Sequence, residues 1–328
     1  MSLKNGLFII SLDFELFWGI HDENYSISEL NSLKETRKVV LQLIELFLKY
    51  NIHVSFSTVG FLFAKNKKEL FQYLPKKRPS YTNTNFSAYH KLEELPDEED
   101  EASIYYASTL LDYISKNKNF EIGTHTFSHY YGLEDGQNTS EFNEDLIAAK
   151  AIASTKNITI KSIIFPRNQY SSTILDTCKD NGIICYRGNE NSWVYKTEAW
   201  SKERLLKKGV RFLDSFFNLT GHHGFDLSLQ KGKSLINLPS SRFLRPYNPK
   251  LSFLNSLKLR RIKRSMTHCA KHQLCYHLWW HPHNFRKNST QNFQFLEEIL
   301  KHFLTLKKEY HFKSQTMEEA ATLIHEKQ

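Results

Sequence analysis

The sequence lacks the features of a membrane protein or of a disulfide-stabilised secreted fold. No stretch approaches the ~18 consecutive apolar residues of a membrane-spanning helix. Only a few apolar residues precede Asp13, and no small-residue cleavage site follows them, so we expect no secretory leader and a cytoplasmic protein. The chain has 4 cysteines, none in a Cys-x-x-Cys pair, and we expect reduced thiols instead of disulfides or a zinc knuckle.

Excess positive charge is present, but without a nucleic-acid-binding motif. The formal net charge is +9 over 328 residues, and it is densest in the run KLRRIKR from Lys258 to Arg264. Because no recognisable binding motif accompanies this run, we expect no nucleic-acid partner. The run is typical of a solvated helix face; peripheral contact with a membrane or with another anionic ligand, such as a sugar nucleotide, is the alternative.

The apolar content and its spacing indicate one α/β domain spanning residues 1–328. Apolar residues make up 40% of the chain and aromatic residues 14%, enough for a sizeable core. Apolar runs of strand length alternate with amphipathic segments, a pattern typical of parallel βαβ units. Strands are expected at 6–12, 53–58, 119–124, 160–165, 183–186, 235–239 and 274–280. Helices are expected at 29–50, 103–116, 140–154, 172–181, 252–272, 292–310 and 314–324.

Two stretches do not follow this alternation. Residues 75–101 are polar, rich in turn formers and then acidic, and we interpret them as an inserted loop over one end of the barrel, more typical of a solvated excursion than of a binding element. No element is assigned with confidence between Trp193 and His223.

Ionisable side chains follow the apolar strands at four separate places. Asp13 and Glu15 follow the first strand, and Arg167 follows the strand that ends near residue 165. Histidines follow two further strands, at positions 125 and 129 and at positions 281 and 283. Because α/β folds place their sites at the carboxyl ends of their strands, we expect these side chains to meet at one rim.

The four-residue histidine spacing alone does not select a metal site, because it occurs three times. One pair is His125 and His129, in the stretch FEIGTHTFSH, where the spacing can bring both imidazoles to the same side. His268 and His272 lie in the basic helix, with no carboxylate nearby. The third pair begins inside an apolar strand, at position 277, so its two members cannot share a helix face. The strand-end position therefore favours the first pair.

These motifs together resemble the polysaccharide deacetylase family, also called the NodB homology or carbohydrate esterase family 4 superfamily. The stretch THTFSH resembles the family's H(S/T)xxH metal motif, and the similarity extends from Leu12 to His283 through four motifs. The resemblance implies a distorted (β/α)7 barrel that hydrolyses acetamide or related C–N bonds with one divalent metal ion.

The resemblance also implies a role for each motif residue. His125 and His129 would be metal ligands. Asp13 would be the catalytic base and Glu15 the third ligand, with the two roles open to exchange because the family pattern has adjacent acids where this chain has Asp-Phe-Glu. Arg167, in Pro-Arg-Asn-Gln-Tyr, stands where the family has its base-orienting arginine.

The last motif implies the general acid. His281 directly follows the final strand and is our choice, with His283 in reserve; Asp214 is a candidate for the acidic partner of His281. Trp18, Tyr170 and His283 are the expected substrate-binding residues, although core packing also explains the tryptophans.

The function expected from this resemblance is hydrolytic. It is the removal of an acetyl group from an N-acetylated sugar, as a cytosolic step in the synthesis of a surface polysaccharide such as O-antigen or capsule. The ion would be zinc, with cobalt, nickel or manganese as alternatives. An allantoinase-like hydrolase of small C–N compounds and a catalytically inactive carbohydrate-binding relative are the alternatives. The sequence does not indicate an oligomeric state.

Overall fold

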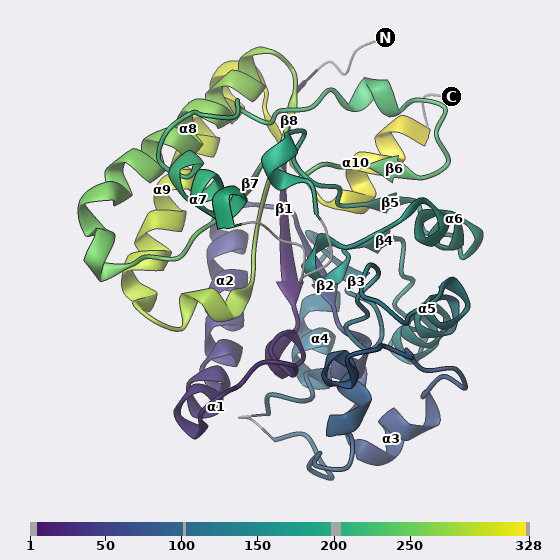
Figure 1. The fold of residues 1–328 in the computed structure, drawn as a ribbon. Helices are drawn as coiled ribbons and strands as arrows, with labels where there is room; N and C mark the ends of the chain where they lie inside the picture. Colours follow the sequence, from purple (N-terminus) through teal and green to yellow (C-terminus); the bar gives the residue numbers. More distant parts are fainter. Residues whose placement is uncertain (1–4, 101–102, 198–204, 326–328) are drawn as a thin grey trace.

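A parallel β-sheet forms the centre of the computed structural model, which describes residues 5–100, 103–197 and 205–325 (Figure 1). Its strand order is β6-β5-β4-β3-β2-β1-β8-β7, with β9 also paired to β1. The strands are β1 Leu7–Phe14, β2 Val54–Thr58, β3 Phe120–Thr124, β4 Ser162–Ile163, β5 Cys185–Tyr186, β6 Ile236–Asn237, β7 Arg242–Phe243, β8 Cys275–Trp280 and β9 Lys313–Gln315.

Backbone hydrogen bonds across residues 236–244 close this sheet into a barrel. On one side, the N–H of Leu238 donates to the carbonyl of Tyr186 over 2.9 Å. On the other side, the N–H of Leu244 donates to the carbonyl of Trp279 over 2.8 Å. Strands β6 and β7 therefore belong to one interrupted strand, which lies between β5 and β8 in the barrel. Strand β9 extends the position of β2, because it pairs with the start of β1 that β2 does not reach. The result is the distorted (β/α)7 barrel that the sequence predicted.

Strand β1 is the central element of the barrel. All eight residues of LFIISLDF are buried, and the strand pairs with β2 on one side and β8 on the other. A continuous apolar run is expected for a strand covered on both faces, because neither face meets water. This burial places Asp13, near the carboxyl end of β1, deep in the molecule.

Helices surround the sheet (Figure 1). Helices α2, α8 and α9 pack together on one side, and α5 packs against α6. The helices are α1 Ile27–Lys34, α2 Thr36–Tyr50, α3 Lys67–Gln72, α4 Ser108–Ser115, α5 Thr139–Ser154, α6 Ser172–Asp180, α7 Leu205–Asp214, α8 Asn255–Lys271, α9 Ser289–Tyr310 and α10 Met317–His325. Short 3-10 turns follow three of the strands: η1 Leu16–Gly19, η5 Pro166–Asn168 and η10 Pro282–Phe285.

Two sequence-based expectations are wrong in detail. The single helix expected at 29–50 is two helices that meet at Glu35, whose N–H bonds to the carbonyl of Ser32 in a tightened final turn. The helix expected at 314–324 begins only at Met317, because Lys313–Gln315 forms strand β9.

The stretch 75–101, described to residue 100, is exposed at more than half of its residues. Its side chains Tyr81, Tyr89 and Leu95 are buried, so apolar contacts hold it against the barrel.

The described part of the chain contains no membrane-spanning helix and no disulfide. Within those residues, no helix is long and apolar enough to cross a bilayer. All four cysteines are buried and free.

Candidate active site

The carboxyl end of β1 carries the two acids of the site. Asp13 and Glu15 are two residues apart, so the extended chain presents them to the same side. Both are buried, with 3% and 4% of their surface exposed. Gly19, at the end of η1, lies against Glu15, because a methyl group added there would overlap its carboxylate. The turn Leu16–Gly19 thus leaves the space that the Glu15 side chain occupies.

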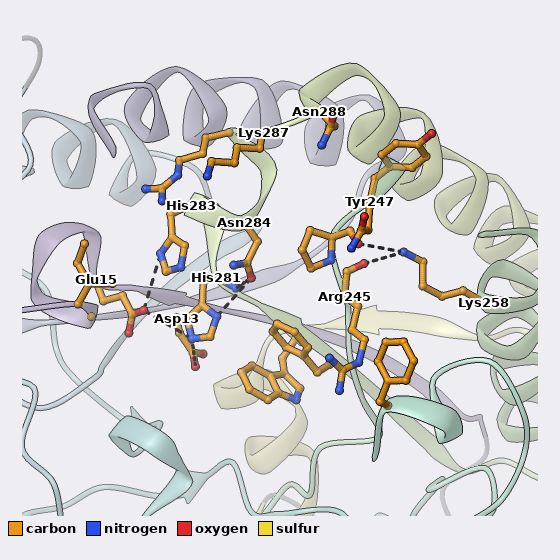
Figure 2. Close-up of a pocket in the computed structure, with 18 of the residues that line it drawn as sticks. Asp13, Glu15, Arg245, Tyr247, Lys258, His281, His283, Asn284, Lys287 and Asn288 are labelled. Carbon is orange, nitrogen blue, oxygen red and sulfur yellow. Dashed lines mark hydrogen bonds and ion pairs between the residues drawn. The ribbon is translucent and has the colours of Figure 1, made fainter. Parts of the chain in front are cut away.

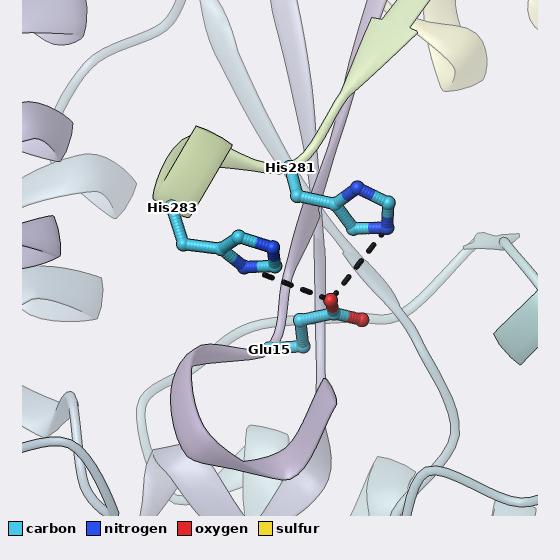
Figure 3. A group of neighbouring side chains, drawn as sticks. All are labelled: Glu15, His281 and His283. Carbon is cyan, nitrogen blue, oxygen red and sulfur yellow. Dashed lines mark ion pairs between the residues drawn. The ribbon is translucent and has the colours of Figure 1, made fainter. Parts of the chain in front are cut away.

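Four imidazoles surround the carboxylate of Glu15. The Nε2 atoms of His129 and His125 lie 3.1 and 3.4 Å from its Oε2. On its other oxygen, Oε1, His281 Nε2 lies at 3.6 Å and His283 Nδ1 at 3.8 Å (Figure 3). Glu15 therefore belongs to two groups that could each hold a metal ion, one with each histidine pair.

The first group has the better geometry for a tetrahedral ion. Zinc bonds of about 2.0–2.1 Å imply ligand atoms about 3.3 Å apart along a tetrahedral edge. The distances from Glu15 to His125 and His129, 3.4 and 3.1 Å, bracket that value, whereas those to His281 and His283 exceed it. The donor set of two imidazoles and one carboxylate also suits a catalytic ion, because it leaves coordination positions open.

The protonation states also suit metal binding. Burial raises the pKa of Glu15, but the neighbouring His281 and hydrogen bonds with His125 and His129 outweigh burial and hold that pKa well below its ordinary value. Burial lowers the pKa of His129 to about 4. Glu15 is thus ionised and His129 neutral near pH 7, the forms that coordinate metal ions.

Asp13 is held by an arginine from a neighbouring part of the rim. Arg187, directly after β5, donates from both terminal nitrogens to the two oxygens of Asp13, over 2.6 and 2.8 Å. Burial raises the pKa of Asp13, but the charge and hydrogen bonds of Arg187, together with His125 and His281, more than offset it, so the net pKa is lowered. Asp13 is therefore an oriented, ionised carboxylate beside the candidate ion site.

His281 reaches the same rim from the end of β8. Its Nε2 lies 3.7 Å from Asp13 Oδ2, and its Nδ1 lies 3.4 Å from the side-chain oxygen of Asn284. The His281 side chain is 24% exposed, more than that of any other member of the cluster. The structure thus brings together Asp13, Glu15, His125, His129 and His281, as the strand-end argument predicted.

Comparisons with known proteins identify the fold. No family model and no curated protein matches the sequence. A solved structure named as a polysaccharide deacetylase from Mycobacterium smegmatis aligns with 100% of this chain and 93% of its own, at a TM-score of 0.62 and 10% identity. This chain has the polysaccharide deacetylase fold.

Two further solved structures support the same fold. Puue allantoinase has a TM-score of 0.56 and 9% identity over 98% of this chain and 91% of its own. A protein named as a polysaccharide deacetylase from Pseudomonas aeruginosa PAO1 has a TM-score of 0.56 and 8% identity, over 98% and 90%. At these identities the likeness concerns the fold, so the chemistry must be argued from the side chains of this deacetylase fold.

Arg167 does not have the position expected for it. Its guanidinium pairs with Asp22 over 2.6 Å and lies 4.2 Å from the centre of the Tyr131 ring. Arg167 has a φ of 53° inside the turn η5, a left-handed conformation. The same turn instead contributes Asn168, whose side-chain oxygen accepts a hydrogen bond from Arg187 over 3.0 Å. The arginine that orients Asp13 is Arg187.

Sequence reasoning missed Arg187 although the signal for it was present. The stretch Arg187-Gly188-Asn189 ends a predicted strand in the same way as the turn containing Arg167. Both arginines satisfy the strand-end rule. Only the three-dimensional arrangement shows which of them reaches Asp13.

Three other expected residues lie elsewhere in this deacetylase fold. Asp214 is not a partner of His281, because it pairs with Arg242 over 2.7 Å. Trp18 is fully buried, and its indole N–H donates to the carbonyl of Tyr105 over 3.0 Å. Tyr170 packs on the rings of Phe165 and Tyr186, away from the cavity lining. The apolar surroundings of Trp18 and Tyr170 make them packing residues.

A cavity of about 820 Å³ opens over the acids and histidines (Figure 2). His283, the third expected substrate-binding residue, lines it, as do Trp279 and Phe243. Trp279 lies under Arg187, whose guanidinium carbon is 3.9 Å from the centre of the ring. The cavity therefore has one aromatic surface beside the catalytic candidates.

Replacing Gly19 with alanine should weaken metal binding without unfolding the protein. The added methyl group would displace the Glu15 carboxylate. Changes beside metal ligands typically reduce metal affinity by about 10- to 100-fold, so we expect a loss of that size in a competition titration with a chelator.

Gly209→Ala is the matched control. Gly209 lies in α7, and its added methyl group meets no atom within 4 Å. We expect unchanged metal affinity in this variant. Wild-type affinity in Gly19→Ala would mean that Glu15 is not a ligand.

Proposed function

We propose that this protein is a metal-dependent hydrolase that removes the acetyl group from an N-acetylated sugar. One observation carries the proposal: a ligand set of Glu15, His125 and His129 lies beside Asp13, an ionised carboxylate that Arg187 holds in place. This pairing of a metal site with an adjacent base suits hydrolysis of an amide.

Glu15, His125 and His129 would hold one divalent ion. Imidazole and carboxylate ligands are compatible with zinc, our first choice, and with cobalt, nickel or manganese. When bound, such an ion supplies Lewis acidity that polarises the acyl oxygen and makes water more acidic. The exchange of roles between the two acids is disfavoured, because Arg187 occupies both oxygens of Asp13 while Glu15 faces the imidazoles.

Asp13 would act as the general base. Because its pKa is lowered, it is unprotonated at neutral pH and can accept a proton from the attacking water. Arg187 fixes the direction of the carboxylate and balances its charge. General-base assistance of this kind contributes roughly 10²–10⁴ in rate.

His281 would protonate the amine that leaves. Its Nδ1 lies near the oxygen of Asn284 and its Nε2 near Asp13, so an imidazolium here presents its second proton among the reacting groups. His283 is less suited to this step, since burial, together with His281, lowers its pKa to about 3 and leaves it without a proton to give at neutral pH. We assign His283 to substrate contact in the cavity.

The acetylated sugar would be a cytoplasmic precursor of a surface polysaccharide such as O-antigen or capsule. The free, buried cysteines are consistent with a reducing compartment. A second candidate function is hydrolysis of a small ureide, favoured by the fold shared with Puue allantoinase at a TM-score of 0.56. An inactive carbohydrate-binding relative is disfavoured, because the acids, histidines and Arg187 are assembled as hydrolysis requires.

Metal content provides a test of the ligand assignment. The protein as purified should contain one divalent ion per chain by inductively coupled plasma mass spectrometry. His125→Ala removes one of three ligands and should lose that ion, because the affinity of the site depends on all three.

His268→Ala is the control, because it removes a histidine of a rival pair on α8. It should keep the ion, and His283→Ala should keep it too. If His283→Ala loses the ion and His125→Ala keeps it, the ion is bound by Glu15, His281 and His283 instead.

Product analysis separates the two candidate functions. Acetate release from N-acetylated sugars should be detected in the metal-loaded enzyme, and Asp13→Asn should reduce it by roughly 10²–10⁴, the usual contribution of a general base. Asn284→Ala should have a smaller effect, because Asn284 acts only through His281. Turnover of allantoin with no acetate release would instead support the ureide function.

The pH profile should depend on Arg187. Arg187 lowers the pKa of Asp13, so its removal raises that pKa and leaves the base protonated at higher pH. In Arg187→Met, the acid limb of kcat/KM should therefore move upward by about one to three pH units, the effect expected for an arginine beside an aspartate.

Arg167→Met is the control for this profile. Its partner is Asp22, so the acid limb should stay in place. If the acid limb shifts in Arg167→Met and not in Arg187→Met, Arg167 orients Asp13, as the sequence suggested.

A further inference from the structure

Cations line the cavity at two places, one across from Glu15 and one near His283 (Figure 2). Arg245 and Lys258 line it at the far end, and Arg286 and Lys287 line it beyond Asn284. Figure 2 shows Lys258 and Arg245 across the cavity from Glu15 and His283. We call Arg245, Lys258, Arg286 and Lys287 the cationic wall.

Lys258 is the most confined member of this wall. Only 5% of its surface is exposed, and its Nζ donates to the carbonyls of Arg245 and Pro246 over 2.9 and 3.3 Å. Burial, together with the charge of Arg245, lowers its pKa to about 8. A buried ammonium beside a guanidinium is unfavourable unless negative charge compensates it.

No direct ion pair provides this compensation in the described residues, although Glu29 interacts at longer range with Arg286 and Lys287. In residues 5–100, 103–197 and 205–325, no carboxylate lies within ion-pair distance of any cation of the wall. Arg245 donates from Nε to the hydroxyl of Ser215 over 2.6 Å, a neutral partner. One terminal nitrogen of Arg286 is buried and has no hydrogen-bond partner.

Two other cations of helix α8 have acidic partners, unlike Lys258. Arg261 lies 3.6 Å from Asp214, and Lys263 lies 3.1 Å from Glu298. The basic run from Lys258 to Arg264 is therefore not one solvated face, as the sequence suggested. Arg261 and Lys263 have acidic partners and Arg260 and Arg264 are exposed to solvent, whereas the buried Lys258 has no acidic partner among the described residues.

The acids of the cavity do not balance the wall either. Asp13 is neutralised by Arg187, and Glu15 by its imidazoles or the ion they would hold. Glu23, the third acid of the lining, interacts with Arg167, and among the described residues it forms no ion pair with a cation of the wall. The unbalanced charge therefore faces the space that a substrate occupies. Tyr247, Asn248 and Asn288 add polar groups beside it.

We propose that the cationic wall binds a phosphate or diphosphate group carried by the N-acetylated sugar. This inference rests on the proposed function and names its substrate class. Arginine and lysine together suit phosphate, because guanidinium forms paired hydrogen bonds and ammonium supplies a compact charge. A diphosphate carries enough negative charge to meet the neighbouring Arg245 and Lys258 together. The sugar would thus be a soluble nucleotide sugar or a lipid-linked one, since both carry this group.

Binding of inorganic pyrophosphate tests the site apart from catalysis. Isothermal titration calorimetry should detect binding to the protein as purified and again after dialysis against EDTA, because the wall does not need the ion. Arg245→Gln and Lys287→Ala should each weaken binding by about tenfold, the loss of one charge-assisted contact. Lys287 is exposed, so its variant should fold normally.

Lys250→Ala is the matched control, because Lys250 is an exposed lysine of the neighbouring segment that does not line the cavity. It should bind pyrophosphate as the wild type does. Absence of binding, binding that disappears with EDTA, or equal binding by all variants would overturn the site. Acetate release from uncharged N-acetyl sugars without pyrophosphate binding would overturn this inference alone and leave the proposed function standing.

Competition with two ligands identifies the source of the diphosphate. Stronger displacement of pyrophosphate by UDP would indicate a nucleotide sugar, and stronger displacement by farnesyl diphosphate a lipid-linked one. Displacement by neither would overturn the proposal.

Discussion

A buried carboxylate among four imidazoles is the interaction on which the rest of this site depends. Glu15 is 4% exposed and has a histidine pair on each oxygen. An ionised carboxylate in such surroundings is costly unless positive charge meets it. In the proposed function, a divalent ion between Glu15 and its two closer histidines would supply that charge. Gly19 leaves room for Glu15, and the ends of β1 and β3 place the ligands together.

The charge of the second acid, Asp13, is compensated by an arginine. This difference distinguishes Asp13 from Glu15. Arg187 neutralises Asp13 through two hydrogen bonds, so Asp13 needs no ion and is suited to the role of base proposed for it. Two carboxylates two residues apart thus acquire distinct chemistry from their neighbours. The proposed phosphate site follows the same logic, because Arg245 and Lys258 have no acidic partner among the described residues.

Much of the barrel was predictable because its longer strands are mostly apolar and covered on both faces. Strands β1 and β8 are largely apolar, and β3 is buried along its length although it contains Glu121 and Thr124. The ligands that follow them were predictable for the same reason. Strands β7 and β9 were missed because their residues, Arg-Phe and Lys-Ser-Gln, form no apolar run.

Long-range pairing was beyond what the sequence could show. Arg167 and Arg187 both follow strands, and only the position of β5 beside β4 and the turn at Arg167 decide which one reaches Asp13. Trp18 was expected to contact substrate because it follows the acids, but η1 turns it into the core. A local pattern reports which residues reach the rim of the barrel, and side-chain packing decides where each one points.

The location of the bound ion tests this account most directly. Anomalous diffraction at the zinc edge from crystals of the zinc-loaded protein should show one ion within about 2.0–2.2 Å of Glu15, His125 and His129, the bond lengths of zinc to oxygen and nitrogen ligands. Asp13 should remain paired with Arg187 outside that coordination sphere. An ion held by His281 and His283, or an ion bound to Asp13 in place of Glu15, would contradict it.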